Sequence, residues 1–238
     1  MVRTTRLRVV VVLAVLGLAL HHASAEVSSG SAQQALAAGN ARFVTEQARD
    51  PHRSAWRRLE TAREGQTPFV TIVSCSDSRV PAELIFDCGV GDLFVVRDAG
   101  NVCGPLELGS VEYAVEHVHT PLVVVMGHTR CGAVIAAVQG GHAHGSIETI
   151  LDLIRPAVAQ VRKEHPNLAD EALVTEVAKA NVWQTIQTLI TGSPIVPQAL
   201  REHHVAVVGA LYDVASGEVT WLGAHPRQQE LVGAAPAP

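Results

Sequence analysis

The chain has 238 residues, 47% of them hydrophobic, which is enough for one domain with a substantial core. Its formal net charge of −5 provides no basic footprint and argues against binding of nucleic acid or anionic membranes. The four cysteines are too few for a small disulfide-stabilised scaffold.

The N-terminus has the pattern of a secretory signal peptide. Three arginines precede an apolar run over 9–20, and Ala23-Ser24-Ala25 follows as a cleavage site. A membrane anchor is the alternative, but the run is shorter than the ~20 residues that span a bilayer. We therefore expect cleavage of 1–25 and export to the periplasm or beyond, with no remaining membrane contact. Removing three Arg and no acids leaves 213 residues with a charge of −8.

Two helices are predicted before the first strand. The first covers 31–44, and Asp50-Pro51 breaks the chain after it. The second covers 54–64, with Ser54 as its N-terminal cap and Gly65 at its end. The helix over 31–44 has little core of its own to cover. We therefore expect it to be an extended arm whose apolar side packs on a second subunit.

The rest of the chain alternates strands with helices, which predicts an α/β fold. The expected architecture is a mostly parallel four-stranded sheet with an antiparallel edge strand and helices on both faces. The parallel strands are expected at 68–73, 93–97, 121–126 and 204–211, and the antiparallel strand at 219–222. The helices are expected at 82–86, 105–118, 130–138, 146–161, 168–190 and 197–201. A single domain would cover 26–232, followed by a disordered tail over 233–238.

Two of the predicted strands are followed directly by residues that can bind a metal. Cys75 follows the strand 68–73, and His128 and Cys131 follow the strand 121–126. Ligands bind at the carboxyl edge of open α/β sheets. Two thiolates and one imidazole form a zinc ligand set that leaves a fourth position open. The pattern predicts a zinc enzyme.

The same residues belong to longer motifs. Cys75-x-Asp77-x-Arg79, joined to His128-x-x-Cys131, resembles the β-class carbonic anhydrases. The resemblance extends over essentially the whole predicted mature chain. Its other matching stretches are 38–43, 83–87, 91–97, 99–101 and 109–113. The chain departs from the family pattern at Cys88, where Gln is expected, and at Asp98, where Asn or an apolar residue is common.

The resemblance implies reversible hydration of carbon dioxide to bicarbonate and a proton by zinc-bound hydroxide. Cys75, His128 and Cys131 would hold one zinc ion per chain. Asp77 and Arg79 would form a pair, in which the carboxylate orients the hydroxide. If released from Arg79, Asp77 could instead ligate zinc and close the site. The alternative is that Asp77 and Arg79 form an ordinary surface ion pair, and the adjacent Cys75 argues against this.

The resemblance also implies substrate-binding residues and a homodimer or a dimer-based higher oligomer. Gln66 and the backbone N–H of Gly132 would donate hydrogen bonds, and Phe94 and Tyr113 would form an aromatic wall around carbon dioxide. In the family, the wall and the glutamine draw on a neighbouring subunit. From the residues alone, Phe94 could be a core residue and Tyr113 an ordinary helix residue.

Some features stay outside this interpretation. A bond between Cys88 and Cys103 is disfavoured, because the strand 93–97 between them spans roughly 16 Å and bridged Cα atoms lie within ~7 Å. His142 and His144 are expected in a solvated loop. Two other functions remain open: hydrolysis of a carbon dioxide analogue such as carbon disulfide, and zinc binding without turnover.

Overall fold

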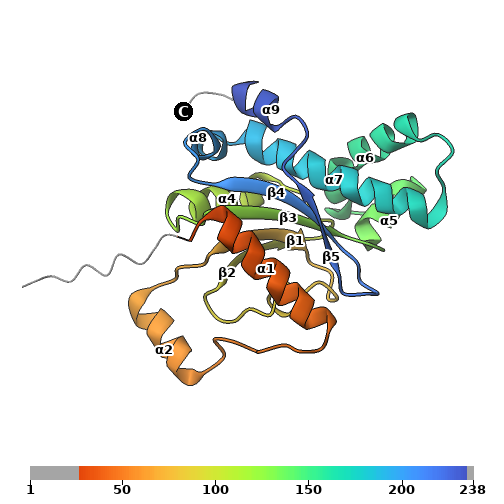
Figure 1. Ribbon diagram of the computed structural model, residues 1–238. Helices are drawn as coiled ribbons and strands as arrows, with labels where there is room; N and C mark the ends of the chain where they lie inside the picture. Colours follow the sequence, from red (N-terminus) through yellow and green to blue (C-terminus); the bar gives the residue numbers. More distant parts are fainter. Residues whose placement is uncertain (1–26, 235–238) are drawn as a thin grey trace, which may run out of the picture.

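The computed structural model describes residues 27–234, so the predicted signal peptide over 1–25 lies outside the described residues. Five strands form one sheet in the order β2-β1-β3-β4-β5 (Figure 1). The strands are β1 (Val70–Cys75), β2 (Leu93–Asp98), β3 (Leu122–His128), β4 (Ala206–Tyr212) and β5 (Val219–Gly223). β1 to β4 are parallel and β5 is antiparallel, which confirms the predicted sheet.

Burial explains why the central strands are mostly apolar in sequence. Every residue of β1 and β3 is buried, because helices cover both faces of the sheet there. β2 and β5, at the two edges, are only partly buried. In the described part of the chain, β2 pairs with a strand on one side only.

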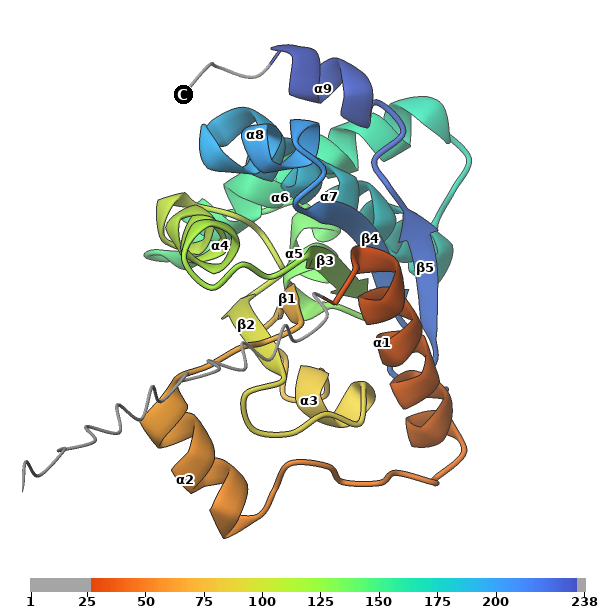
Figure 2. The ribbon, with the colours of Figure 1, turned by 60° about the vertical axis from the view of Figure 1, so that its left-hand side comes forward.

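Helices form a layer on each face, as predicted. On one face, α1 (Ser29–Val44) and α3 (Ala82–Ile85) pack in a core cluster with β1, β3 and β4. The opposite face is covered by four helices, and two more pack with α7 at the carboxyl end of the sheet (Figures 1 and 2). The helices that cover the opposite face are α4 (Pro105–Glu116), α7 (Asp170–Gly192), α8 (Ile195–Arg201) and α9 (Gln228–Ala234). The helices at the carboxyl end are α5 (Gly132–Gln139) and α6 (Ile147–Glu164).

Helix α1 packs on the sheet of its own chain. Ala32 and Leu36 are fully buried in the core cluster of this face. Gly39 lies so close to the Phe86 carbonyl that an added Cβ would be 1.9 Å from its oxygen. The expectation that the apolar side of 31–44 packs on a second subunit is therefore wrong. The physical reason is that α3 is too short to cover this face alone.

Helix α2 (Ala55–Glu64) is the exposed part of the N-terminal helical region. It begins and ends as predicted, and Ser54 Oγ accepts a hydrogen bond from the Arg57 N–H at 3.0 Å. None of its residues is buried, and Trp56 is 68% exposed and Leu59 42%. Figure 2 shows it projecting away from the sheet.

The C-terminal helix α9 was not predicted from the sequence. It packs through the buried Leu231 against the core cluster that contains α7 and α8. It includes Gly233 and Ala234, the first two residues of the predicted tail, and the remaining four lie outside the described residues. Between residues 27 and 234, no helix has both the length and the apolar character needed to cross a membrane.

Candidate metal centre

The three predicted metal ligands meet at the carboxyl edge of the sheet. β1 and β3 are neighbouring parallel strands, so Cys75 and His128 at their ends reach the same edge. Cys131 is the N-terminal cap residue of α5, which begins directly after this edge. The ligand atoms of the three side chains lie within 4.8 Å of one another, and all three residues are buried. This spacing allows the three side chains to bind one cation together.

His128 is oriented for metal binding. Its Nδ1 lies 2.9 Å from the Thr129 carbonyl oxygen, so the ring donates its Nδ1 hydrogen there. The Nε2 atom is buried and has no hydrogen-bond partner among the described residues. A metal-binding imidazole is held in its tautomer by this kind of second hydrogen bond. The Nε2 atom therefore has a free lone pair that can bind a cation.

The pKa values of the two thiols are shifted in opposite directions. A hydrogen bond from the Cys131 thiol lowers the pKa of Cys75, and the Gly100 and Asp77 N–H groups add donors at 3.2 and 3.4 Å. The hydrogen bond to Cys75, burial and the neighbouring Cys75 charge raise the pKa of Cys131. With the two sulfur atoms 4.0 Å apart, a second thiolate requires positive charge between them. The donor set therefore fits zinc.

Asp77 and Arg79 form the predicted pair beside this cluster. Arg79 Nε donates to Oδ1 at 2.9 Å and Nη2 donates to Oδ2 at 2.7 Å, a two-pronged contact. The Arg79 guanidinium holds the pKa of the Asp77 carboxyl well below its usual range. Arg79 also donates to the Arg130 carbonyl at 3.1 Å, which links the loops after β1 and β3. Asp77 is thereby held outside the ligand cluster as a charged acceptor.

The structure adds two residues of β2 that the sequence analysis gave no role. Arg97 donates to the carbonyl oxygens of Cys75 and Asp77 at 3.0 and 2.8 Å, and so fixes the loop after β1. Asp98 Oδ1 accepts from the Val102 N–H, and its buried Oδ2 has no partner within 27–234. Burial raises the pKa of Asp98 to about 7. Both lie in or beside stretches that carry the family resemblance, but these contacts depend on the sheet register.

The predicted substrate-binding residues are not all near the metal ligands. Gly132 directly follows Cys131 as the first residue of α5. Phe94 and Tyr113 lie together, with ring centroids 6.2 Å apart. Phe94, however, pairs with Thr71 in the register, four residues before the ligand on β1, or roughly 13 Å along the strand. Gln66 is exposed between α2 and β1. The roles of these residues stay predictions.

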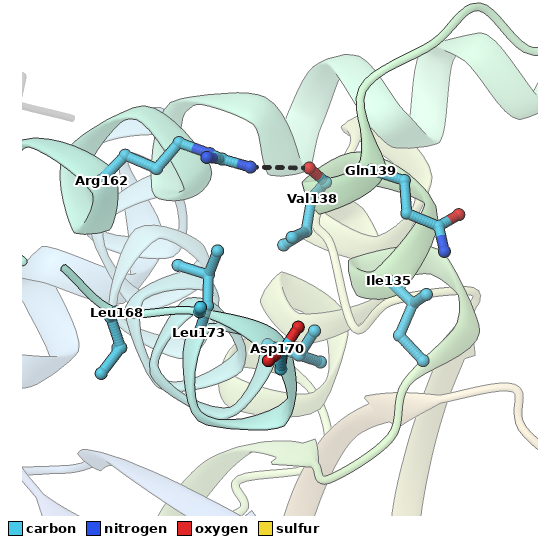
Figure 3. Close-up of a pocket in the computed structure, with 9 residues that line it drawn as sticks. Ile135, Val138, Gln139, Arg162, Leu168, Asp170 and Leu173 are labelled. Carbon is cyan, nitrogen blue, oxygen red and sulfur yellow. Dashed lines mark hydrogen bonds between the residues drawn. The ribbon is translucent and has the colours of Figure 1, made fainter. Parts of the chain in front are cut away.

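A pocket of about 380 Å³ lies between the ends of α5, α6 and α7 (Figure 3). Its walls include Ile135, Leu168 and Leu173, and Arg162 at its rim donates to the Val138 carbonyl at 3.0 Å. None of its lining residues is a predicted site residue.

The other two cysteines are free, as expected. Burial raises the pKa of the Cys88 and Cys103 thiols to about 12, so both stay protonated. His142 lies in an exposed loop and contacts Glu148 at 3.2 Å. These residues form no second metal cluster within 27–234.

The parallel sheet with two cysteines and one histidine at its carboxyl edge defines an α/β protein with a zinc-type centre. Comparison with known proteins specifies the class further. A family model described as carbonic anhydrase matches residues 70–219. The chain therefore belongs to the carbonic anhydrase family, and its structural neighbours place it in the β class.

Relatives and solved structures agree with this assignment. Carbonic anhydrase 2 of Mycobacterium tuberculosis is 37% identical over 191 residues, covering 79% of this chain and 89% of the relative. A carbonic anhydrase of Mycolicibacterium smegmatis is 38% identical over 193 residues, covering 79% and 91%. The β-carbonic anhydrase CafA of Aspergillus fumigatus has a TM-score of 0.68 at 32% identity, covering 85% of this chain and 95% of the other. A tetrameric β-carbonic anhydrase of Sordaria macrospora has a TM-score of 0.65 at 28% identity, covering 82% and 98%.

Proposed function

We propose that this carbonic anhydrase hydrates carbon dioxide reversibly to bicarbonate and a proton, using one zinc ion held by Cys75, His128 and Cys131. When bound, zinc would supply hydroxide near neutral pH, because it lowers the pKa of a coordinated water to ~7. The observation that carries the proposal is the buried ligand cluster next to a charged carboxylate.

The chain's own residues then have separate tasks. Asp77, charged and held by Arg79, only accepts hydrogen bonds, so it selects and orients a hydroxyl that still carries its hydrogen. Thr129 fixes the ring of His128 through its carbonyl oxygen. The first N–H groups of α5, beginning at Gly132, point toward the ligand edge and favour negative charge there. The N-terminus of α5 thus favours an anionic product such as bicarbonate, and Asp77 restricts the bound species to one that still carries a hydrogen.

A second subunit is part of this proposal. Phe94 lines a pocket of about 280 Å³ along the edge strand β2, and Leu106 and Tyr113 beside it are 81% and 49% exposed. Trp56 and Leu59 of α2 are exposed apolar groups as well. Among the described residues β2 pairs on one side only, and such an edge strand together with exposed apolar side chains favours association with a second copy. The tetrameric Sordaria relative supports a dimer or a dimer-based assembly.

Export is proposed from the N-terminal pattern. The arginines, the apolar run over 9–20 and Ala23-Ser24-Ala25 support cleavage before Glu26. N-terminal sequencing of the native protein should therefore begin at Glu26. A cytoplasmic protein that retains Met1 would contradict export without affecting the catalytic proposal.

The decisive experiment measures zinc content and stopped-flow hydration of carbon dioxide on the same purified protein. We expect one zinc per chain and rapid hydration that disappears when a chelator removes the metal. Zinc without hydration would indicate a binding protein. Hydrolysis of carbon disulfide in place of hydration would indicate the analogue-specific enzyme.

A further inference from the structure

The turn that follows β2 touches the metal centre through its backbone. The Gly100 N–H donates to Cys75 Sγ at 3.2 Å. Gly100 and Asn101 both have left-handed backbone conformations, with φ of +84° and +44°. A Cβ at position 100 would lie 2.8 Å from Ile154 Cδ1 and 3.1 Å from Ala133 Cβ. The turn is therefore tightly enclosed, and small shifts in it would move the N–H relative to the sulfur atom.

Helix α7 holds this turn by two side-chain donors one helical turn apart. Asn181 Nδ2 donates to the Gly100 carbonyl at 2.7 Å, and Thr185 Oγ1 donates to the Asn101 carbonyl at 3.0 Å. Both side chains belong to buried residues on a helix whose other buried residues are all apolar. Burying such polar groups costs free energy unless they are hydrogen-bonded. Only one side-chain hydrogen bond offsets this cost for Asn181, because its Oδ1 has no partner among the described residues.

We propose that Asn181 and Thr185 are positioning residues of the metal centre. By fixing the turn at 100–101, they keep the Gly100 N–H on Cys75 Sγ. This hydrogen bond draws electron density from the thiolate and sets how much charge the sulfur donates to a bound metal. Hydrogen bonds around a metal-binding sulfur tune the metal, and loss of such outer contacts typically costs ~10- to 100-fold in metal affinity or activity. The inference rests on the proposed function, because it takes Cys75 to be a metal ligand.

Cobalt(II) substitution tests the inference, because the energy of the thiolate-to-cobalt absorption band reports the electron density on sulfur. The loss variants are Asn181→Leu and Thr185→Val, which keep the number and branching of the side-chain heavy atoms and remove the donor. Thr185→Ser is the conservative variant that keeps the hydroxyl. We expect the band to move to longer wavelength in both loss variants and zinc affinity to fall ~10-fold or more. Thr185→Ser should resemble the wild type.

Leu189→Ala is the control for general loosening of α7. Leu189 is fully buried on the same helix but belongs to the core cluster against the sheet. It should lower the melting temperature without moving the band. A similar band shift in Leu189→Ala, or unchanged band and affinity in both loss variants, would overturn the inference.

The outcomes separate this inference from the proposed function. A wild-type protein that binds cobalt without a thiolate band would refute the metal centre itself, and the inference with it. A normal wild-type band that the substitutions do not change would refute only the inference. If Asn181→Leu fails to fold, the comparison of Thr185→Val with Thr185→Ser decides.

Discussion

The carboxyl edge of β1 and β3 and the edge strand β2 differ in how much of a site one chain supplies. At the first edge, Cys75, His128 and Cys131 are buried together and already oriented by backbone partners. Along β2, Phe94 is only partly buried and Tyr113 is 49% exposed. The predicted metal ligands are enclosed within one chain, whereas the predicted aromatic wall is partly open to solvent.

This difference has a physical cause. Polar metal ligands must be enclosed and hydrogen-bonded by the same fold that places them, or their burial is too costly. Aromatic side chains can remain at the surface of one chain and be covered by another. Substitutions in the two regions should therefore affect different properties, namely metal content in the first and assembly in the second.

The largest effect is expected for Cys131→Ser. A serine hydroxyl is a poor zinc ligand compared with a thiolate, so the variant should lose most of its zinc and at least ~10²-fold in turnover. Metal analysis and stopped-flow hydration measure both. Cys103→Ser is the matched control, because Cys103 is buried but lies outside the cluster. One zinc per chain with normal turnover in Cys131→Ser would remove Cys131 from the site.

The next effect concerns Asp77 and Arg79. Asp77→Asn should keep zinc but slow turnover by up to ~10²-fold, because the charged acceptor that orients the nucleophile is lost. Arg79→Ala should also be slow, because it frees Asp77 to ligate the metal. The double variant cannot close the site in this way and should be no slower than Arg79→Ala, which is strong non-additivity. Turnover of the three variants provides the comparison.

A different result for Asp77 and Arg79 would contradict this prediction. If the two losses multiply and the crystal structure of Arg79→Ala shows Asp77 away from zinc, the two residues act independently. Holding Asp77 away from the metal would then not be the function of Arg79.

The assembly prediction concerns Trp56→Glu. Because Trp56 is 68% exposed, a charge there should leave the monomer folded while weakening the contact between subunits. Light scattering should show a shift toward monomers, with activity falling in parallel if the aromatic wall is shared. Arg63→Glu on the exposed side of α2 is the control for charge. A Trp56→Glu protein that remains dimeric and fully active would exclude α2 from the interface.

The smallest effect is expected at Asp98. Its pKa is raised to about 7 by burial, against ~3.9 in an unfolded chain. The folded state therefore binds more protons between pH 4 and 7, and the Asp98 contribution to stability declines as the pH rises through this window. Asp98→Asn should be more stable than the wild type at pH 8 by on the order of 1 kcal/mol, since water screens part of the shift. Urea unfolding at pH 5 and 8 measures the difference, and an equal change at both pH values would contradict it.

The sequence by itself predicted the chain order of the strands and of the helices before α9, and it predicted three metal ligands that the structure brings together. Continuous β-branched runs such as 121–126 predict strands covered on both faces, and residues at the ends of parallel strands necessarily meet at one edge. That local logic was sufficient for Cys75, His128 and Cys131. It was also sufficient for the caps of α2, which depend on nearby residues.

Only the tertiary structure decided how distant segments meet. The periodicity of 31–44 indicates an apolar side but not what covers it, and the structure places α1 on its own sheet because that face was otherwise open. The short helix α9 has too weak a pattern to predict and depends on packing by Leu231. The bond from Asn181 to the Gly100 carbonyl joins positions 81 residues apart, a contact that the packing of α7 against the turn creates.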